Sequence, residues 1–147
     1  MEVDRFCRKK TTIEAKPQYA DTDMMGVVYH ANYLKYFELG RTAFIEEAGY
    51  SYVQMEEEGY FAPVYDAYAK YKQPLKYGDV ATIVTWLTLN DGVKTIYTYE
   101  IRNQNDEVCV TGYTTHVIVK KDTFRPVPFK RAFPEWFKTY QALMDQD

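Results

Sequence analysis

The longest stretch of helical spacing in the chain covers residues 30–48. Apolar and small side chains recur there every three or four positions, at Tyr33, Tyr36, Phe37, Gly40, Phe44 and Ala48, with Leu34 and Ile45 widening the stripe. The polar residues Lys35, Glu38, Thr42 and Glu46 form one narrow strip. A helix that is apolar over most of its circumference is largely buried. The pattern therefore predicts a helix wrapped by a sheet and capped by Gly49, in which Arg41 needs a partner such as Glu38.

Extended segments flank this helix on both sides. One covers residues 11–19, and four follow the helix at residues 62–72, 80–89, 93–102 and 108–120. Asn90-Asp91-Gly92 is a hairpin signal, and the other connections are short, so the last four segments predict an antiparallel meander. A short helix is expected at residues 51–58, and an amphipathic helix begins near Pro134. The prediction is an α+β protein with one domain over residues 1–147.

Length and charge narrow the functional classes. The 147 residues suffice for one domain with a sizeable core. The net charge is −3 without a basic tail, which argues against nucleic acid as the main partner, although a local basic patch for a nucleotide phosphate stays open.

The cysteines and the N-terminus predict the compartment. Cys7 and Cys109 are the only cysteines, and they match no zinc or redox spacing. Residues 1–5 lack the apolar run of a signal peptide, and no apolar run is long enough to span a bilayer. We therefore expect a reduced, cytoplasmic protein without a membrane span.

Two carboxylates, Asp21 and Asp23, and one glycine, Gly26, lie just before the predicted helix. The free N–H groups of a first helical turn stabilise developing negative charge, and a carboxylate beside them can act as base or nucleophile. Aspartate is also common in loops because it caps the local backbone. The residues alone leave both interpretations open.

Other chemistries fit this chain poorly. Ser51 is the only serine and lacks a nucleophile-elbow context. Asp21, Asp23 and Gly26 match three positions of a calcium loop, but Met25 stands where the loop needs an oxygen ligand, and Asn32 stands where it needs a bidentate glutamate. We expect no metal and no bound cofactor, and we expect both cysteines to be inert.

The stretch from Asp21 to Arg41 carries a family resemblance. It contains Asp-Thr-Asp-x-x-Gly-Val-Val-Tyr-His-x-Asn-Tyr-Leu-x-Tyr-Phe-Glu-x-x-Arg. This resembles the signature of the hotdog-fold acyl-CoA thioesterases, in the branch of the 4-hydroxybenzoyl-CoA and Tol-Pal-associated thioesterases. The resemblance implies an antiparallel sheet of about five strands curled around a long central helix, with a C-terminal helix. It also implies hydrolysis of an acyl-CoA to a carboxylic acid and CoA.

The resemblance also implies residue roles. Asp23 stands at the position of the catalytic carboxylate, as nucleophile or as general base. The backbone N–H of His30 stands where the family polarises the thioester carbonyl; an imidazole base is the alternative. Lys94, after the hairpin turn, resembles a basic residue that contacts CoA, and Tyr29 is the second candidate for substrate binding. Asp21 and the strand residue His116 are expected to be structural.

The same family resemblance also suggests two rival functions and an oligomeric state. A hotdog hydratase would resemble a signature with histidine soon after the aspartate, whereas Met24 and Met25 follow Asp23 here. A non-catalytic acyl-CoA or acyl-carrier binding module would keep the pocket without needing Asp23. Open sheet edges tend to pair, and the resembled family joins edge to edge, so we expect a homodimer or homotetramer with the site at the subunit boundary.

Overall fold

The computed structural model describes residues 9–144. Thirteen elements follow one another in this part of the chain: β1 (Thr11–Ala15), η1 (Tyr19–Asp21), η2 (His30–Asn32), α2 (Tyr33–Glu47), α3 (Tyr52–Glu57), β2 (Tyr60–Phe61), β3 (Val64–Tyr71), β4 (Ala81–Asn90), β5 (Lys94–Arg102), β6 (Val108–Lys120), β7 (Pro126–Val127), α4 (Phe129–Ala132) and α5 (Pro134–Met144). No helix within these residues is long and apolar enough to cross a membrane.

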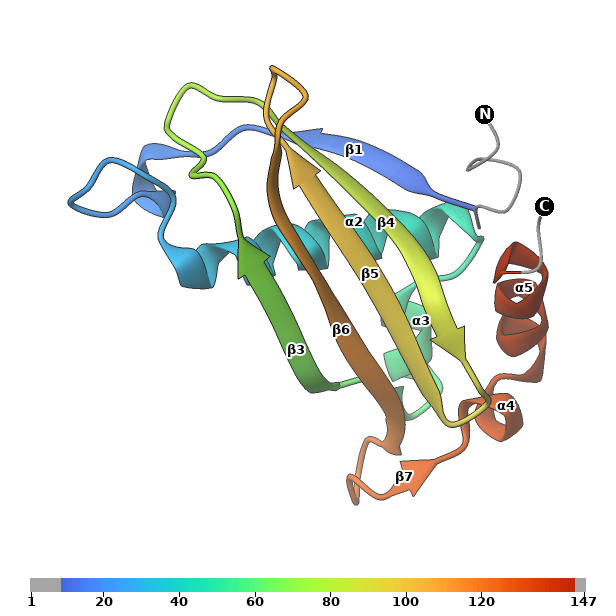
Figure 1. Cartoon of the computed structure of the whole chain (residues 1–147). Coiled ribbons are helices and arrows are strands. Elements are labelled where there is room, and N and C mark those ends of the chain that lie inside the picture. The colour runs from blue at the N-terminus through green and yellow to red at the C-terminus, as the bar shows by residue number, and fades with distance from the viewer. Residues whose placement is uncertain (1–8, 145–147) are drawn as a thin grey trace.

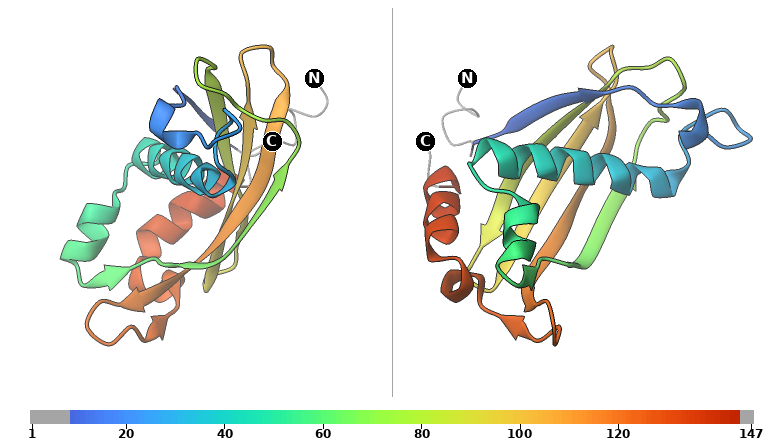
Figure 2. Two further views of the ribbon diagram at one scale, coloured as in Figure 1. Left: turned by 90° about the vertical axis from the view of Figure 1, so that its left-hand side faces the viewer. Right: turned by 180° about the vertical axis from the view of Figure 1, so that it is seen from behind.

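The strands form one antiparallel sheet in the order β1-β4-β5-β6-β3, with α2 lying across one of its faces (Figures 1 and 2). The two-residue strands β2 and β7 pair with the C-terminal end of β6 and raise the strand number to seven. The predicted α+β class and hotdog architecture are thereby confirmed, including the C-terminal helix. The expected number of about five strands matches the five longer strands, β1, β3, β4, β5 and β6, and leaves out β2 and β7.

The predicted four-strand meander is only partly correct. Strands β4, β5 and β6 follow one another as neighbours, but β3 pairs with β6 instead of β4. Both sides of β4 are already occupied, by β1 and by β5, so the free side of β6 is the one left for β3. The segment after β3 therefore crosses the end of the sheet, and β3 becomes an open edge (Figure 1).

Two glycines let α2 lie close to the sheet. A Cβ at Gly40 would meet the side chains of Thr85 and Ile83 on β4, and a Cβ at Gly112 on β6 would meet the Phe37 ring. Phe37 stacks on Tyr99 of β5 with ring centroids 4.4 Å apart. The stripe predicted from the helical spacing is thus the face that packs on the sheet.

The sheet covers only one side of α2, which corrects the expected burial. Ile45 is buried, but Leu34 and Leu39 on the other side are exposed at 44% and 43%. On the open edge strand, Tyr65, Tyr68 and Tyr71 are similarly exposed. A single chain therefore leaves part of the apolar surface of α2 and of β3 uncovered.

Two element boundaries also differ from the prediction. The first strand ends at Ala15 because Pro17 follows, which cannot donate to a strand ladder. The helix begins at His30, as expected, but its first turn is a 3₁₀ turn before α2 starts at Tyr33.

The C-terminal helix completes the core. Trp136 and Tyr140 of α5 are buried, and the hydroxyls of Tyr140 and Tyr97 lie 2.9 Å apart. The apolar side predicted for this helix is therefore the side that packs against the sheet.

Candidate active site

Asp21 anchors the loop that precedes α2. Its buried carboxylate accepts hydrogen bonds from Lys35 Nζ (2.7 Å), the Tyr36 hydroxyl (2.9 Å) and the Gln18 N–H (2.9 Å). Burial raises the pKa of Asp21, but these hydrogen bonds outweigh burial and hold the pKa below its ordinary value. With so many partners, this carboxylate ties the loop to the helix.

The backbone of Asp21 closes the same loop. Its carbonyl accepts from the Tyr29 N–H (2.9 Å) and from Asn32 Nδ2 (2.8 Å). Between these contacts the chain folds back on itself through a bridge from Thr22 to Val28. The loop is therefore fixed at both ends.

Asp23 lies at the start of the turn within this loop. Its Oδ1 accepts from the Met25 N–H at 2.8 Å, and its carbonyl accepts from the Gly26 N–H at 3.0 Å. Gly26 has a φ of 78°, a left-handed conformation that suits glycine. Within residues 9–144 no partner is found for Asp23 Oδ2. One carboxylate oxygen of Asp23 thus stays available for other chemistry.

Asp23 and His30 line the same cavity, of about 310 Å³, together with Tyr33, Tyr71 and Lys72. The Tyr71 hydroxyl donates to the His30 carbonyl at 3.2 Å, which fixes the backbone at the helix start. In the described part of the chain, no hydrogen-bond acceptor is found for the His30 N–H. A free helix-start N–H and a carboxylate beside one cavity can stabilise an oxyanion and supply a base or nucleophile.

The other two candidates lie outside this cavity in one chain. The Tyr29 ring packs on the His30 ring, with centroids 4.3 Å apart, but Tyr29 does not line the cavity. Lys94 sits over the Tyr65 ring at 5.1 Å, at the other end of the sheet. Lys94 pairs with Val117 on β6 and Tyr71 with Val110, which separates them by about 23 Å along that strand.

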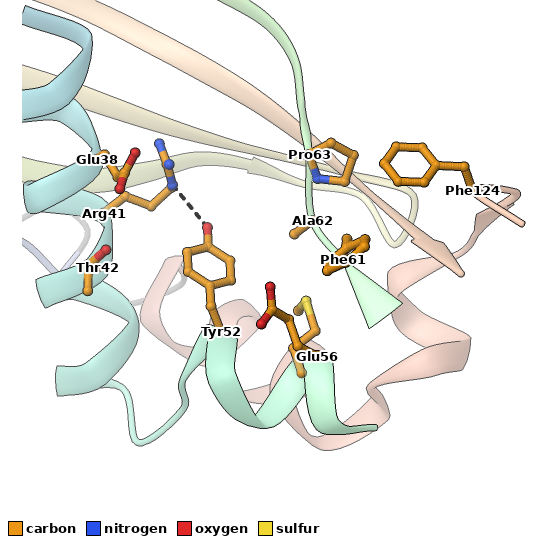
Figure 3. A pocket seen from close by; sticks show the side chains of 10 residues that line it. Glu38, Arg41, Thr42, Tyr52, Glu56, Phe61, Ala62, Pro63 and Phe124 are labelled. Carbon is orange, nitrogen blue, oxygen red and sulfur yellow. Dashed lines mark hydrogen bonds between the residues drawn. The ribbon is translucent and has the colours of Figure 1, made fainter. Parts of the chain in front are cut away.

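A second cavity, of about 360 Å³, was not predicted from the sequence. Arg41 lines it, donating from Nε to the Tyr52 hydroxyl (2.9 Å) and from Nη1 to the Tyr99 hydroxyl (3.2 Å) (Figure 3). The expected Glu38 partner is wrong, because no ion pair within residues 9–144 involves Arg41. The only signal in the sequence was an arginine on the apolar side of the helix.

The remaining polar candidates are structural. His116 is buried, with Nδ1 3.0 Å from the Ala62 carbonyl and Nε2 3.0 Å from Thr114 Oγ1. Burial raises the pKa of the Cys109 thiol, which is free, while Cys7 lies outside the described residues. Residues 9–144 contain no cluster of three or more side chains suited to holding a metal ion.

Several known proteins are similar to this chain in both sequence and fold. YneP of Bacillus subtilis (strain 168), which carries a provisional acyl-CoA thioesterase name, is 44% identical over 128 residues, covering 87% of this chain and 93% of that protein. The crystal structure of DHNA-CoA thioesterase from Staphylococcus aureus matches with a TM-score of 0.88 and 37% identity, over 90% of this chain and 89% of that one. A 1,4-dihydroxy-2-naphthoyl-CoA hydrolase of Thermosynechococcus vestitus is 25% identical over 122 residues, covering 82% of this chain and 84% of that protein.

The fold and these likenesses define the class as hotdog-fold thioesterases. The chain belongs to the Thioesterase-like superfamily, whose family model matches residues 17–137. The prediction of a hotdog thioesterase from the Asp21–Arg41 stretch is thereby confirmed.

Proposed function

We propose that this protein hydrolyses acyl-CoA thioesters to a free carboxylic acid and CoA. The proposal rests on one observation above all: Asp23 and the start of the helix at His30 line one cavity, and each has a polar group without a partner among the described residues. These two elements, a donor for the carbonyl oxygen and a carboxylate near the carbonyl carbon, can together catalyse thioester hydrolysis.

The His30 N–H binds the thioester oxygen and stabilises the negative charge that develops on it. Asp23 then follows one of two routes. It attacks the carbonyl carbon to give a mixed anhydride that water hydrolyses, or it takes a proton from water while that water attacks. In either route the C–S bond breaks, and CoA leaves as a thiolate that takes up a proton.

We further propose that two copies pair through β3 and complete the site. Exposure of β3 along an open edge supports this, because unpaired strand edges bind other strands. Antiparallel pairing would bring the Val64 end of one β3 beside the Tyr71 end of the other. Lys94 of the partner subunit, near that Val64 end, would then approach the Asp23 cavity and could meet a CoA phosphate. Further pairing of dimers would give a tetramer.

The names of two relatives suggest the acyl group. One is a DHNA-CoA thioesterase and another a 1,4-dihydroxy-2-naphthoyl-CoA hydrolase, so an aromatic acyl group is the first candidate for this chain. A cytoplasmic location remains the proposal drawn from the sequence, and the free, buried thiol of Cys109 is compatible with it.

The test is release of free thiol from a panel of aliphatic and aromatic acyl-CoAs, followed with a thiol-reactive dye. We expect turnover of at least one aromatic substrate, and no loss of rate on addition of a chelator. Binding without thiol release would favour the acyl-CoA binding module. If an enoyl-CoA in the panel loses its enoyl absorbance without thiol release, a hydratase would be favoured. No thiol release from any member of the panel would overturn the proposal.

A further inference from the structure

The His30 N–H that we assign to the thioester oxygen belongs to the peptide unit that joins Tyr29 to His30. Because a peptide unit is planar, the rotation of the whole unit sets the direction of this N–H, whatever the His30 side chain does. Tyr29 has an extended backbone (φ −63°, ψ 136°) and directly precedes the 3₁₀ turn His30–Asn32. A donor at such a boundary is aimed at one point only if other groups hold its peptide unit in place.

A closed ring of three hydrogen bonds holds this peptide unit. The Tyr29 N–H donates to the Asp21 carbonyl at 2.9 Å. The Asn32 N–H donates to the Tyr29 carbonyl at 2.8 Å. The Asn32 side chain closes the ring, because its Nδ2 donates to the same Asp21 carbonyl at 2.8 Å. Asn32 therefore bonds to the carbonyl of the peptide unit that carries the His30 N–H, and its amide ties that unit to Asp21.

Asp21 is a fixed point for this ring. It is buried, and its carboxylate accepts from Lys35 and Tyr36, both on α2. These bonds hold the Asp21 backbone in place relative to the helix. The Asn32 amide then connects the fixed Asp21 carbonyl to the first turn of the same helix. The position of the His30 N–H relative to α2 thus depends on the Asn32 side chain.

Asn32 does not line the Asp23 cavity, so it can act on a substrate there only through another group. It is half-buried, and both of its donors are used within the ring. Tyr71 differs in this respect. Its hydroxyl donates to the His30 carbonyl, but Tyr71 also lines the cavity, so its substitution would mix positioning with substrate contact. Asn32 is therefore the residue whose substitution isolates positioning.

We infer that Asn32 is a positioning residue whose side-chain amide fixes the direction of the His30 N–H before the substrate binds. The inference rests on the proposed thioesterase function. The bond that the Tyr29 carbonyl accepts also polarises its peptide unit, which strengthens the His30 N–H as a donor. A fixed donor stabilises the oxyanion of the transition state more than the neutral carbonyl of the bound substrate. Loss of the Asn32 amide should therefore lower kcat and leave KM nearly unchanged.

Substitution of Asn32 is the first test. Asn32→Leu removes the amide donors at similar volume. With the panel substrate that the unmodified protein hydrolyses fastest, kcat should fall at least ~10-fold and KM should change less than about twofold. This loss should exceed that of His30→Ala, although His30 lines the cavity and Asn32 does not. Asn105→Leu, in the exposed turn between β5 and β6, is the matched control and should keep kcat.

Asn32→Asp replaces this variant if Asn32→Leu does not fold. It keeps the size of the side chain, removes the amide donors and adds a negative charge that a helix N-terminus favours. The same loss of kcat at nearly constant KM is expected. A kcat within about threefold of the unmodified protein in the folded variant would overturn the inference and leave the proposed thioesterase intact. If the unmodified protein releases no thiol from any panel substrate, both proposals fail.

Infrared difference spectra separate positioning from a general loss of stability. Asp23→Asn keeps the bound thioester intact, and the same substrate, isotope-labelled at its carbonyl carbon, reports the carbonyl stretch. A donor aimed at the carbonyl oxygen polarises the bond and lowers the stretching frequency. Adding Asn32→Leu to Asp23→Asn should raise that frequency, whereas adding Asn105→Leu should leave it unchanged. Equal frequencies with and without the Asn32 substitution would show that Asn32 does not position the donor.

Discussion

The packed face of the sheet and the open β3 edge treat polar groups differently. On the packed face, unpaired buried atoms such as Thr85 Oγ1 are sealed beneath α2, next to Gly40. Along the β3 edge, groups for which residues 9–144 offer no partner belong to residues that line cavities: Asp23 Oδ2 and the His30 N–H at one end, and Arg41 Nη2 at the other. The packed face maintains the fold, and the open edge is where the proposed active site lies.

The same contrast between satisfied and free polar groups distinguishes Asp21, whose carboxylate has three hydrogen-bond partners, from Asp23, whose Oδ2 has none within residues 9–144. Asp23→Asn keeps the shape of the side chain but removes the base or nucleophile, so kcat should fall at least ~10²-fold. Substrate binding should change little, because ground-state contacts are largely kept. Rates of thiol release under saturating substrate measure the effect.

Asp21→Asn is the matched comparison. It weakens the hydrogen bonds of a buried carboxylate, so the free energy of unfolding should fall by about 1 to 3 kcal/mol. The folded variant should keep far more activity than Asp23→Asn. Near-normal kcat in Asp23→Asn would mean that this carboxylate only caps the loop.

The packed interior should respond to pH through His116. Burial, and then the positive charge of Arg41, lower the pKa of His116 to about 4. In the unfolded chain, His116 binds a proton near pH 6.5, whereas in the folded chain it does so only near pH 4. The free energy of unfolding therefore decreases as the pH falls from about 6.5 to about 4. The full loss is about 3 kcal/mol.

Urea unfolding at pH 7.5 and pH 5 measures this loss. His116→Asn has no imidazole to titrate and should be less sensitive to pH over this range. An equal loss of stability in the wild type and the variant would assign the pH dependence to other groups.

Removal of the His30 side chain should show the smallest effect. His30→Ala keeps the backbone N–H that we assign to the oxyanion, so kcat should fall less than about 10-fold, well below the loss for Asp23→Asn. His30→Pro removes the N–H and should abolish turnover if circular dichroism confirms a folded chain. A loss in folded His30→Ala equal to that of Asp23→Asn would make the imidazole catalytic.

Local patterns predicted the helix and the loop, because both depend on neighbours in sequence. The spacing of Tyr33, Tyr36 and Phe37 identified the face that packs on the sheet. The Asp21–Arg41 stretch identified the family. It also identified Asp23 and His30 as site candidates, and both line the same cavity. Its helical part overestimated the burial of Leu34, since the pattern does not reveal how far a sheet extends over a helix.

Long-range partners could not be predicted in the same way. The position of β3 depends on which strand edge remains free after the others have paired. Arg41 bonds to Tyr99, 58 residues away, and no periodic pattern encodes that contact. The Arg41 cavity is formed by segments that meet only in the folded chain, so its lining residues carry no joint signal in the sequence.

Ala67→Pro tests most directly whether the open edge completes the site. The Lys72 N–H bonds to β6, and N–H direction alternates along a strand, so the N–H of exposed Ala67 faces the open edge. Proline is tolerated there in a single chain but removes a bond to a second β3. We predict a folded monomer by light scattering with thiol release reduced at least ~10-fold, while Ala67→Val stays dimeric and active. A fully active Ala67→Pro monomer would contradict the account.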